Sequence, residues 1–365
     1  MITSVSVKNF KGFRDTRIQG LTPVTLIGGR NNAGKSSILE AIFLLYSAYN
    51  QRTFNQQFSL RGAGNLYHNT IDDWVTLFYG GNINSVMSIN IQTDRDLYGL
   101  EYSIDRSAHA PDISIPPEIL NQVGPLQNTT VSDGVLKSSF SKNGNKIYQT
   151  ELFTNGTYRT NLKVKENLPK ATIILTGNVR SFNAQVLTQL DINNKMDIVL
   201  DALRIIEPSI KSISVVPVES RRNLIINGIP NLQITTDAEI YVDTGLAKKM
   251  PLKLMGDGMG HLINFVITIA DSENGLVLID EIENGIHYSV RKVLWEKLRD
   301  IAKQFNCQIV ATTHSYECLQ AAAEAITNGD LSYIRLDRDR QNDVKAVSYS
   351  VEDLQLALKM NMEVR

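Results

Sequence analysis

Eight consecutive residues have the types and spacing to bind phosphate groups. They are Gly29-Arg30-Asn31-Asn32-Ala33-Gly34-Lys35-Ser36, and they match the pattern G-x-x-x-x-G-K-[ST]. Glycines let a backbone wrap around phosphates, and the amides at a helix start face the anion. Lys35 would neutralise phosphate charge, and Ser36 would offer its hydroxyl to Mg²⁺. We expect this loop and the adjoining Ser37 to bind a nucleotide.

Two adjacent carboxylates follow a second apolar run. Leu276–Ile279 is followed directly by Asp280 and Glu281. We expect Asp280 to hold Mg²⁺, directly or through water. Glu281 is then placed to orient or deprotonate the attacking water, because adjacent positions at a strand end can serve metal and water separately. The pair predicts hydrolysis, with Glu281 and Lys35 as catalytic residues.

Two further features are consistent with a nucleotide site. His314 follows the apolar run Gln308–Thr312 and could reach the γ-phosphate, because polar residues at the carboxyl ends of parallel strands point into a ligand crevice. A purely structural histidine is the alternative. The turn Gly256-Asp257-Gly258 opens an apolar helix, whose start could bind an anion or could be an ordinary helix cap.

The flanking patterns predict an α/β fold. Pro23–Ile27 is an apolar strand, and residues 36–48 have apolar positions at helical spacing, so strand, loop and helix follow in succession. Residues 276–312 have the strand, helix, strand rhythm of a parallel sheet. Both ends of the chain are therefore expected to contribute to one core.

We expect four segments along the chain. Residues 1–81 form the N-terminal part of the core with the phosphate loop, beginning with paired strands that turn at Lys11-Gly12. Residues 82–170 form a β-rich insert, where short alternating runs are broken by polar loops. Residues 171–215 add a strand and a helical lid, and residues 216–365 complete the core.

Composition limits the class of protein. The 365 residues hold 37 Lys plus Arg against 38 Asp plus Glu, so net charge names no partner and DNA binding stays open. A hydrophobic fraction of 42% excludes general disorder. Only Cys307 and Cys318 are present, which predicts neither a disulfide framework nor a metal cluster. With no signal peptide and no apolar stretch near the roughly 20 residues that cross a bilayer, we expect a soluble cytoplasmic protein without membrane contact.

The order of these motifs resembles that of ABC-type ATPase heads in the SMC, RecF and OLD-like families. The run from Asp280 to His287 is similar to the Asp-Glu-Pro-Glu-x-x-Leu-His element of OLD and RecF-like proteins, with Ile282 in place of proline. Met255–Met259 and Thr312–Cys318 resemble runs in compact standalone ABC-type ATPases of the AAA-domain group. This resemblance implies a P-loop ATPase head with a mixed β-sheet core, an antiparallel β subdomain and a helical lid insert.

The resemblance also implies roles for individual residues. Lys11 and Phe13 would lie on the adenine side, and Glu283 would begin the loop that faces the other subunit. Gly256, Asp257 and Gly258 would contact ATP across a homodimer or higher homo-oligomer, through backbone amides because Gly256 stands where ABC transporters carry serine. The implied cofactors are ATP and Mg²⁺. The family's Q-loop glutamine is not located; Gln51, Gln56 and Gln57 follow the first helix.

Three functions remain open at this point. The leading hypothesis is an ATP-driven switch or scaffold that regulates a separately encoded effector, such as a nuclease or toxin, in bacterial anti-phage defence of the PARIS, Septu or retron kind. The chain ends at Arg365, where OLD proteins continue into a nuclease domain, so we expect no nuclease of its own. The alternative is a RecF- or SMC-like DNA-binding ATPase in repair or recombination, and a small-molecule kinase is the third. The DNA-binding alternative would use a basic cluster of Lys211, Arg221, Arg222, Lys248, Lys249 and Lys253.

Overall fold

The computed structural model describes residues 1–49, 70–108, 134–154, 157–163, 167–175, 182–226, 229–360 and 362–364. The chain divides into two compact units, each made of segments that are far apart in sequence. The phosphate-loop pattern begins in the second unit and continues in the first, across the Gly29–Arg30 peptide bond. The first unit comprises Met1–Leu21, Arg30–Leu168 and Leu336–Ser348, and the second comprises Thr22–Gly29, Pro169–Arg335 and Tyr349–Arg365.

The first unit contains a seven-stranded sheet in which every neighbouring pair is antiparallel. Phe10 pairs with Phe13, which confirms the expected turn at Lys11-Gly12. The antiparallel strands expected after residue 82 are also confirmed. In the order β2-β1-β4-β5-β6-β7-β8, the strands are Phe13–Gln19, Ile2–Phe10, Met87–Thr93, Leu97–Asp105, Val135–Lys142, Asn145–Phe153 and Tyr158–Leu162.

Helix α1, Lys35–Tyr46, packs against β1, β4 and β5 of this sheet. Its buried residues include Ile38, Leu39 and Ile42, which confirms the helix predicted from apolar spacing. The short helix α3, Ile71–Val75, buries Trp74 and is capped by the Thr70 hydroxyl, which accepts from the Asp73 amide.

The second unit is built on a sheet whose central strands are parallel, as the strand, helix, strand rhythm predicted. Because these strands share one direction, the carboxyl ends of β3, β15 and β14 lie along one edge. β16 begins in this unit and ends in the first, where most of β17, Val344–Ser350, lies. In the order β16-β3-β15-β14-β9, the strands are Leu331–Arg338, Val24–Gly29, Gln308–Thr312, Leu276–Ile279 and Ala171–Ile174.

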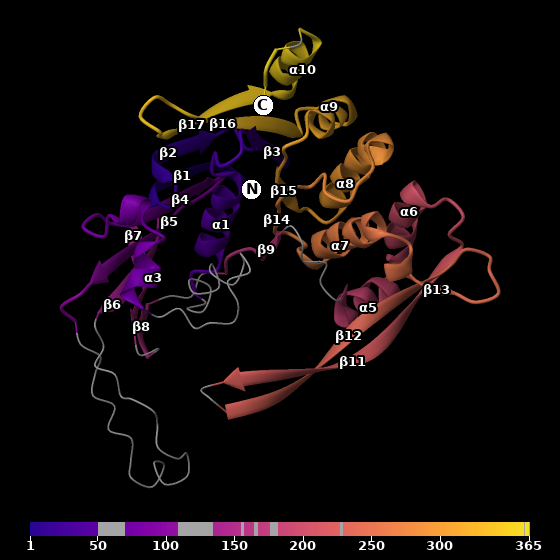
Figure 1. The fold of residues 1–365 in the computed structure, drawn as a ribbon, viewed down its shortest axis with the longest axis horizontal. Coiled ribbons are helices and arrows are strands. Elements are labelled where there is room, and N and C mark those ends of the chain that lie inside the picture. The colour runs from indigo at the N-terminus through magenta and orange to yellow at the C-terminus, as the bar shows by residue number, and fades with distance from the viewer. Residues whose placement is uncertain are drawn as a thin grey trace. The chain divides into compact units, whose positions relative to one another are not determined.

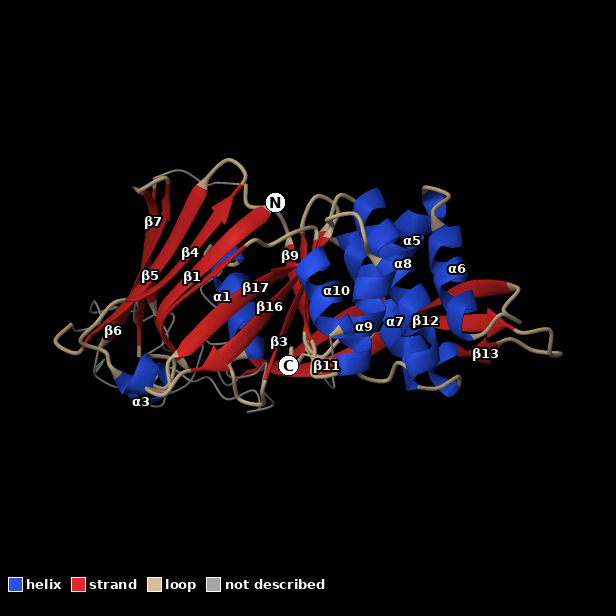
Figure 2. Cartoon of the chain, turned by 90° about the horizontal axis from the view of Figure 1, so that it is seen from above, coloured by secondary structure: helices blue, strands red, loops and turns tan. Residues whose placement is uncertain are grey.

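Helices of the second unit lie side by side in the order α10, α9, α8, α7, α6 (Figures 1 and 2), and each contacts the next. They bury a continuous apolar core that includes Leu26, Val277 and Ile309 from the sheet. The expected helical segment after residue 183 is present as α5 and α6, both packed on α7. Their bounds are Ala184–Ile192 for α5, Met196–Ile206 for α6, Asp257–Asp271 for α7, Arg291–Gln304 for α8, Tyr316–Ala325 for α9 and Val351–Lys359 for α10.

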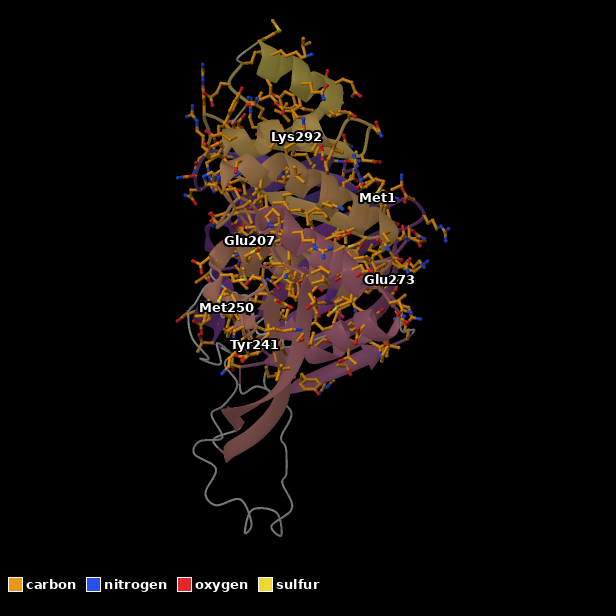
Figure 3. All side chains as sticks on the ribbon, turned by 90° about the vertical axis from the view of Figure 1, so that its right-hand side faces the viewer. Met1, Glu207, Tyr241, Met250, Glu273 and Lys292 are labelled. Carbon is orange, nitrogen blue, oxygen red and sulfur yellow. The ribbon has the colours of Figure 1, made fainter. Side chains whose placement is uncertain are left out.

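A long antiparallel hairpin in the second unit had no counterpart in our sequence analysis. β11, Ser212–Ile226, pairs with β12, Ile229–Asp243, from Ser212↔Asp243 to Ile226↔Ile229. β10, Phe182–Asn183, and β13, Met250–Pro251, flank β12. Figure 3 labels Tyr241 of β12 and Met250 of β13, which belong to adjacent pairs of this small sheet. No helix in the described part of the chain is long and apolar enough to span a membrane.

Candidate active site

The phosphate loop in the first unit has the backbone of an anion-binding turn. Asn32 and Gly34 both adopt positive φ, +62° and +98°, and Gly34 forms the cap of α1. A glycine cap offers no side-chain acceptor, and the helix dipole places positive partial charge there, so the start of α1 suits a phosphate. A Cβ on Gly34 would approach Cζ of Phe13 to 2.6 Å. Only glycine therefore fits at this position.

Lys35 is buried, and its ammonium donates to the carbonyl oxygen of Arg30 at 2.9 Å. The Lys35 side chain thus reaches back across the phosphate loop, and its ammonium group contacts a backbone oxygen of that loop. The Arg338 guanidinium supports the same loop from β16, because its Nε donates to the carbonyl oxygen of Asn32 at 3.1 Å. Both contacts lie within the first unit and hold the loop in shape.

The two adenine-side candidates have clear partners inside the first unit. The Phe13 ring is fully buried beneath Gly34, so it supports the loop from below. The Lys11 ammonium forms an ion pair with the Glu40 carboxylate of α1, whose side chain is almost completely buried. An adenine contact by either residue stays a prediction.

The catalytic candidates of the second unit gather at the carboxyl edge of its parallel sheet. Ile279 pairs with Ala311 and Thr312 pairs with Ile27, which places the ends of β14, β15 and β3 side by side. Asp280 follows β14, His314 follows β15, and Gly29 ends β3. The unit therefore brings the start of the phosphate loop, the acidic pair and the histidine to one edge, which is where parallel sheets bind ligands.

The acidic pair is fixed by Thr312, whose side chain is buried. The Thr312 hydroxyl lies 2.6 Å from Oδ1 of Asp280 and accepts from the Glu281 amide at 2.8 Å. Glu281 has φ +50°, a left-handed conformation that costs a non-glycine residue about 1–2 kcal/mol. The two carboxylates have different partners, because Asp280 contacts Thr312 while Glu281 contacts Asn284 and lies near His314.

The Glu281 carboxylate lies between two side chains. Oε1 is 3.5 Å from Nε2 of His314, and Oε2 accepts from the side-chain nitrogen Nδ2 of Asn284 at 2.7 Å. The His314 and Glu281 side chains are 36% and 33% exposed, so both can meet a ligand. The hydrogen bond from Asn284 orients the carboxylate, as a residue that positions a water molecule requires.

Glu283 joins the loop after β14 to the end of β15. One of its carboxylate oxygens accepts from the His314 amide at 2.6 Å, while the other is buried without a hydrogen-bond partner among the described residues. The sequence analysis assigned Glu283 only to a subunit-facing loop. In the structure, it also fixes the main chain of the candidate phosphate sensor.

The glycine turn at the start of α7 is exposed at Gly256 and Asp257, whereas Gly258 is half-buried against a neighbouring loop. A Cβ on Gly258 would approach the carbonyl oxygen of Gly285 to 2.6 Å. Likewise, a Cβ on Gly285 would meet the His261 ring. These close approaches place the loop after Asp280 directly against the first turn of α7.

Each unit carries one of the oxygen donors that the sequence analysis expects for Mg²⁺. In the first unit this is the Ser36 hydroxyl, and in the second it is the Asp280 carboxylate; both are hard oxygen ligands of the kind that Mg²⁺ prefers. Among the residues that the structure describes, no cluster of three or more His, Cys, Asp or Glu could hold a metal by itself. Mg²⁺ commonly takes its remaining ligands from phosphates and water. A Mg²⁺ ion would supply neutralisation of phosphate charge, and the roles of Ser36 and Asp280 as its ligands and of Glu281 in orienting water stay predictions.

Comparison with known proteins identifies the family. A family model described as "AAA domain, putative AbiEii toxin, Type IV TA system" matches residues 24–319. The chain belongs to this AAA-domain family. The match runs from β3 to α9 and so includes the phosphate loop, the acidic pair and His314.

Two relatives of this AAA-domain chain are named as nucleotide hydrolases. It is 26% identical over 354 residues to an "ATP/GTP phosphatase" of Helicobacter pylori, an alignment that covers 91% of this chain and 90% of the relative. It is also 46% identical over 46 residues to the "DNA double-strand break repair Rad50 ATPase" of Archaeoglobus fulgidus, covering 13% of this chain and 5% of that protein. Membership of the AAA-domain family and the match to the phosphatase along most of the chain support the expected ATP hydrolysis.

A solved structure shows the same kind of fold. The chain is similar to an SMC head, in "Crystal structure of the SmcHead bound to the C-winged helix domain of ScpA", with a TM-score of 0.51 and 14% identity. The match covers 96% of this chain and 98% of that one. The α/β architecture expected from the sequence, that of a P-loop ATPase head, is thereby confirmed.

Several residues at the site were missed by sequence reasoning. Thr312 was noted only as part of a strand end, although the alignment of β14 with β15 places it beside Asp280. The sequence signal that could have revealed this contact is that polar residues, Asp280 and Thr312, stand at the ends of two strands expected to be adjacent. Three further partners carry no local signal. Asn284 reaches Glu281 in the second unit through the turn of a loop, and in the first unit Glu40 pairs with Lys11 and Arg338 bonds the phosphate loop, each from another element.

Proposed function

We propose that this ATPase is a switch whose nucleotide state is passed from the acidic pair to the turn at α7. The observation that carries the proposal is the loop from Asp280 to Gly285. Glu283 in this loop binds the His314 amide, and Gly285 lies against Gly258. One short loop therefore contacts both the hydrolysis site and the turn expected to meet ATP.

In this proposal, Gly29 to Ser37 bind the phosphates, and Ser36 and Asp280 hold Mg²⁺. Glu281 orients the attacking water, and His314 senses the γ-phosphate. Gly256, Asp257 and Gly258 of a second copy complete the site. ATP then joins two copies, and hydrolysis separates them.

The helices α5 and α6 are placed to respond to a movement of the turn at the start of α7. α5 and α6 pack on α7, and Cδ1 of Ile206, at the end of α6, would lie 3.9 Å from a Cβ on Gly258. A shift at the turn would therefore meet α6 directly. We propose that a separately encoded effector reads this segment or the β-rich residues 82–170.

The biological setting is proposed from the family. Its description names a type IV toxin-antitoxin system, and the similar SMC head is titled as bound to a domain of ScpA. Both are consistent with a cytoplasmic ATPase head that works with another protein. We propose bacterial anti-phage defence as the context, with a nuclease or toxin as the effector.

The mass in solution tests the switch. Glu281→Gln protein is measured without nucleotide, with ADP and Mg²⁺, and with ATP and Mg²⁺. We expect a larger assembly only with ATP, because binding is kept while turnover is slowed. Lys35→Ala is the matched control and should stay small in all three conditions. A persistent monomer of Glu281→Gln would contradict the proposal, and one constant assembly would indicate a scaffold that ATP does not join.

DNA binding is the second candidate, favoured by the local match to the Rad50 ATPase. Within the expected basic cluster, the charge of Lys253 is offset by an ion pair with Glu239 at 3.2 Å, whereas Lys249 keeps its charge and donates to the neutral Ser214 hydroxyl at 2.8 Å. ATPase rates with and without duplex DNA, at low and high salt, distinguish the candidates. Stimulation that disappears with salt would support DNA binding.

A further inference from the structure

The Thr312 hydroxyl makes a contact that none of the expected roles uses. It touches two consecutive residues of the proposed hydrolysis site, Asp280 through its carboxylate and Glu281 through its amide. The Thr312 carbonyl oxygen also accepts from the Ile282 amide at 3.1 Å. One residue of β15 thus binds three consecutive residues that follow β14.

Proton counting fixes the direction of both side-chain hydrogen bonds. An amide can only donate, so the Thr312 oxygen accepts from Glu281. A hydroxyl has a single proton, and the Asp280 oxygen at 2.6 Å is an acceptor, so that proton points to the carboxylate. The result is a series of two hydrogen bonds, from the Glu281 amide to the Thr312 hydroxyl and from that hydroxyl to the Asp280 carboxylate. At 2.6 Å, the hydrogen bond from the hydroxyl to the carboxylate oxygen is a short one.

The Thr312 hydroxyl fixes the orientation of two groups at the site. On Asp280 it fixes the rotation of the carboxylate that is proposed to hold Mg²⁺. On Glu281 it secures the amide of a residue with φ +50°, and so fixes the direction in which the Glu281 side chain leaves the backbone. Thr312 is fully buried, so water cannot replace its hydroxyl without a rearrangement.

We propose that Thr312 is a positioning residue for ATP hydrolysis, which sets the orientation of the Mg²⁺-binding carboxylate and of Glu281 through one hydroxyl. The proposal rests on the proposed roles of Asp280 and Glu281. A threonine hydroxyl suits this task because it both accepts and donates, whereas valine of similar shape does neither.

Three variants test the proposal. Thr312→Val removes the hydroxyl, and Thr312→Ser keeps it while removing the methyl group. Thr25→Val is the matched control, because Thr25 is equally buried in the neighbouring strand β3 and its hydroxyl bonds Ser332 and Thr22 instead. For each variant, kcat and KM for ATP, the melting temperature and the binding of a fluorescent ATP analogue are measured. Binding is titrated with Mg²⁺ and repeated in EDTA.

We expect Thr312→Val to lower kcat by about 10- to 100-fold and to raise the Mg²⁺ concentration for half-maximal nucleotide binding about tenfold, as the loss of a ligand's hydrogen-bond partner typically does. Binding in EDTA should change less than about twofold, because the phosphate loop does not touch this hydroxyl. Thr312→Ser should keep most of the parental kcat and Mg²⁺ dependence. Thr25→Val should have the same kcat and Mg²⁺ dependence as the parent.

Two results would overturn the proposal. One is a Thr312→Val protein with parental kcat and parental Mg²⁺ dependence. The other is an equal loss in all three variants that follows their melting temperatures, because that pattern marks a merely structural hydroxyl. Glu281→Gln, measured beside them, separates this inference from the proposed function. If Glu281→Gln hydrolyses ATP at the parental rate, the proposed function is contradicted. The role of Thr312 is tested separately, by how the binding of the ATP analogue to Thr312→Val depends on Mg²⁺ concentration.

Discussion

The amide of His314 donates to the carboxylate of Glu283 at 2.6 Å, across the gap between the ends of β15 and β14. The histidine that could sense phosphate is therefore held by the loop that carries the proposed catalytic glutamate. Its ring also lies 3.5 Å from the Glu281 carboxylate. Movement of this loop would carry His314 and Glu281 together.

Replacing Glu283 tests this connection. We expect Glu283→Ala to lower kcat about tenfold with a smaller effect on KM, because a loosely held His314 misplaces a group needed during the reaction. Glu283→Gln keeps an oxygen acceptor and should retain most activity. Steady-state kinetics measure both. Glu273→Ala is the control, since this exposed carboxylate, labelled in Figure 3, precedes the opposite end of β14. Equal rates for all variants would show that the contact does not position the site.

A second test concerns the close approach of Gly258 to Gly285. Alanine usually favours a helix over glycine by about 1 kcal/mol, but here its Cβ would lie 2.6 Å from a backbone oxygen. Such overpacking typically costs about 1–3 kcal/mol, so we expect Gly258→Ala to be less stable than the parent. Urea unfolding measures the difference. Asp257→Ala, in the exposed part of the same turn, should change stability by less than about 1 kcal/mol. A stabilised Gly258→Ala protein would refute the packing argument.

The sequence predicted those parts of the fold that depend on local pattern. The alternating residues before Lys11, the apolar spacing of α1 and the strand before Asp280 each identify their own element. The β11–β12 hairpin was missed because its strands contain Pro217 and a polar stretch around Arg221, although Asn227-Gly228 between apolar runs is a hairpin signal. Strand-edge geometry, such as the contact of Thr312 with Asp280, depends on register between strands distant in sequence. No local pattern encodes that register.

The two cysteines give a prediction about alkaline stability. Burial raises the pKa of Cys307 to about 12, and burial followed by the nearby Glu283 charge raises that of Cys318 to about 11. In the unfolded chain both thiols lose their protons near pH 9, so there the native state holds more protons and stability falls as pH rises. For each thiol, the free energy of unfolding falls with a slope that approaches about 1.4 kcal/mol per pH unit. Urea unfolding between pH 8 and 10 should show a shallower loss for the double variant Cys307→Ala, Cys318→Ala than for the parent. Identical slopes would contradict the burial of these thiols.

Mixing two inactive variants tests whether a second copy completes the site. Lys35→Ala removes the phosphate-loop cation, and Asp257→Lys alters the exposed turn without touching the packed Gly258. Gly258 itself is unsuitable, because its replacement disturbs the fold of its own subunit. In a two-fold dimer, a mixed pair has one site with both defects and one intact site. With random exchange, we expect about one quarter of the parental ATPase rate, since half of the dimers are mixed and each has one working site. If the mixture stays as inactive as its components while mass measurements show exchange, each site is complete within one subunit, and ATP cannot join two copies through the turn at α7.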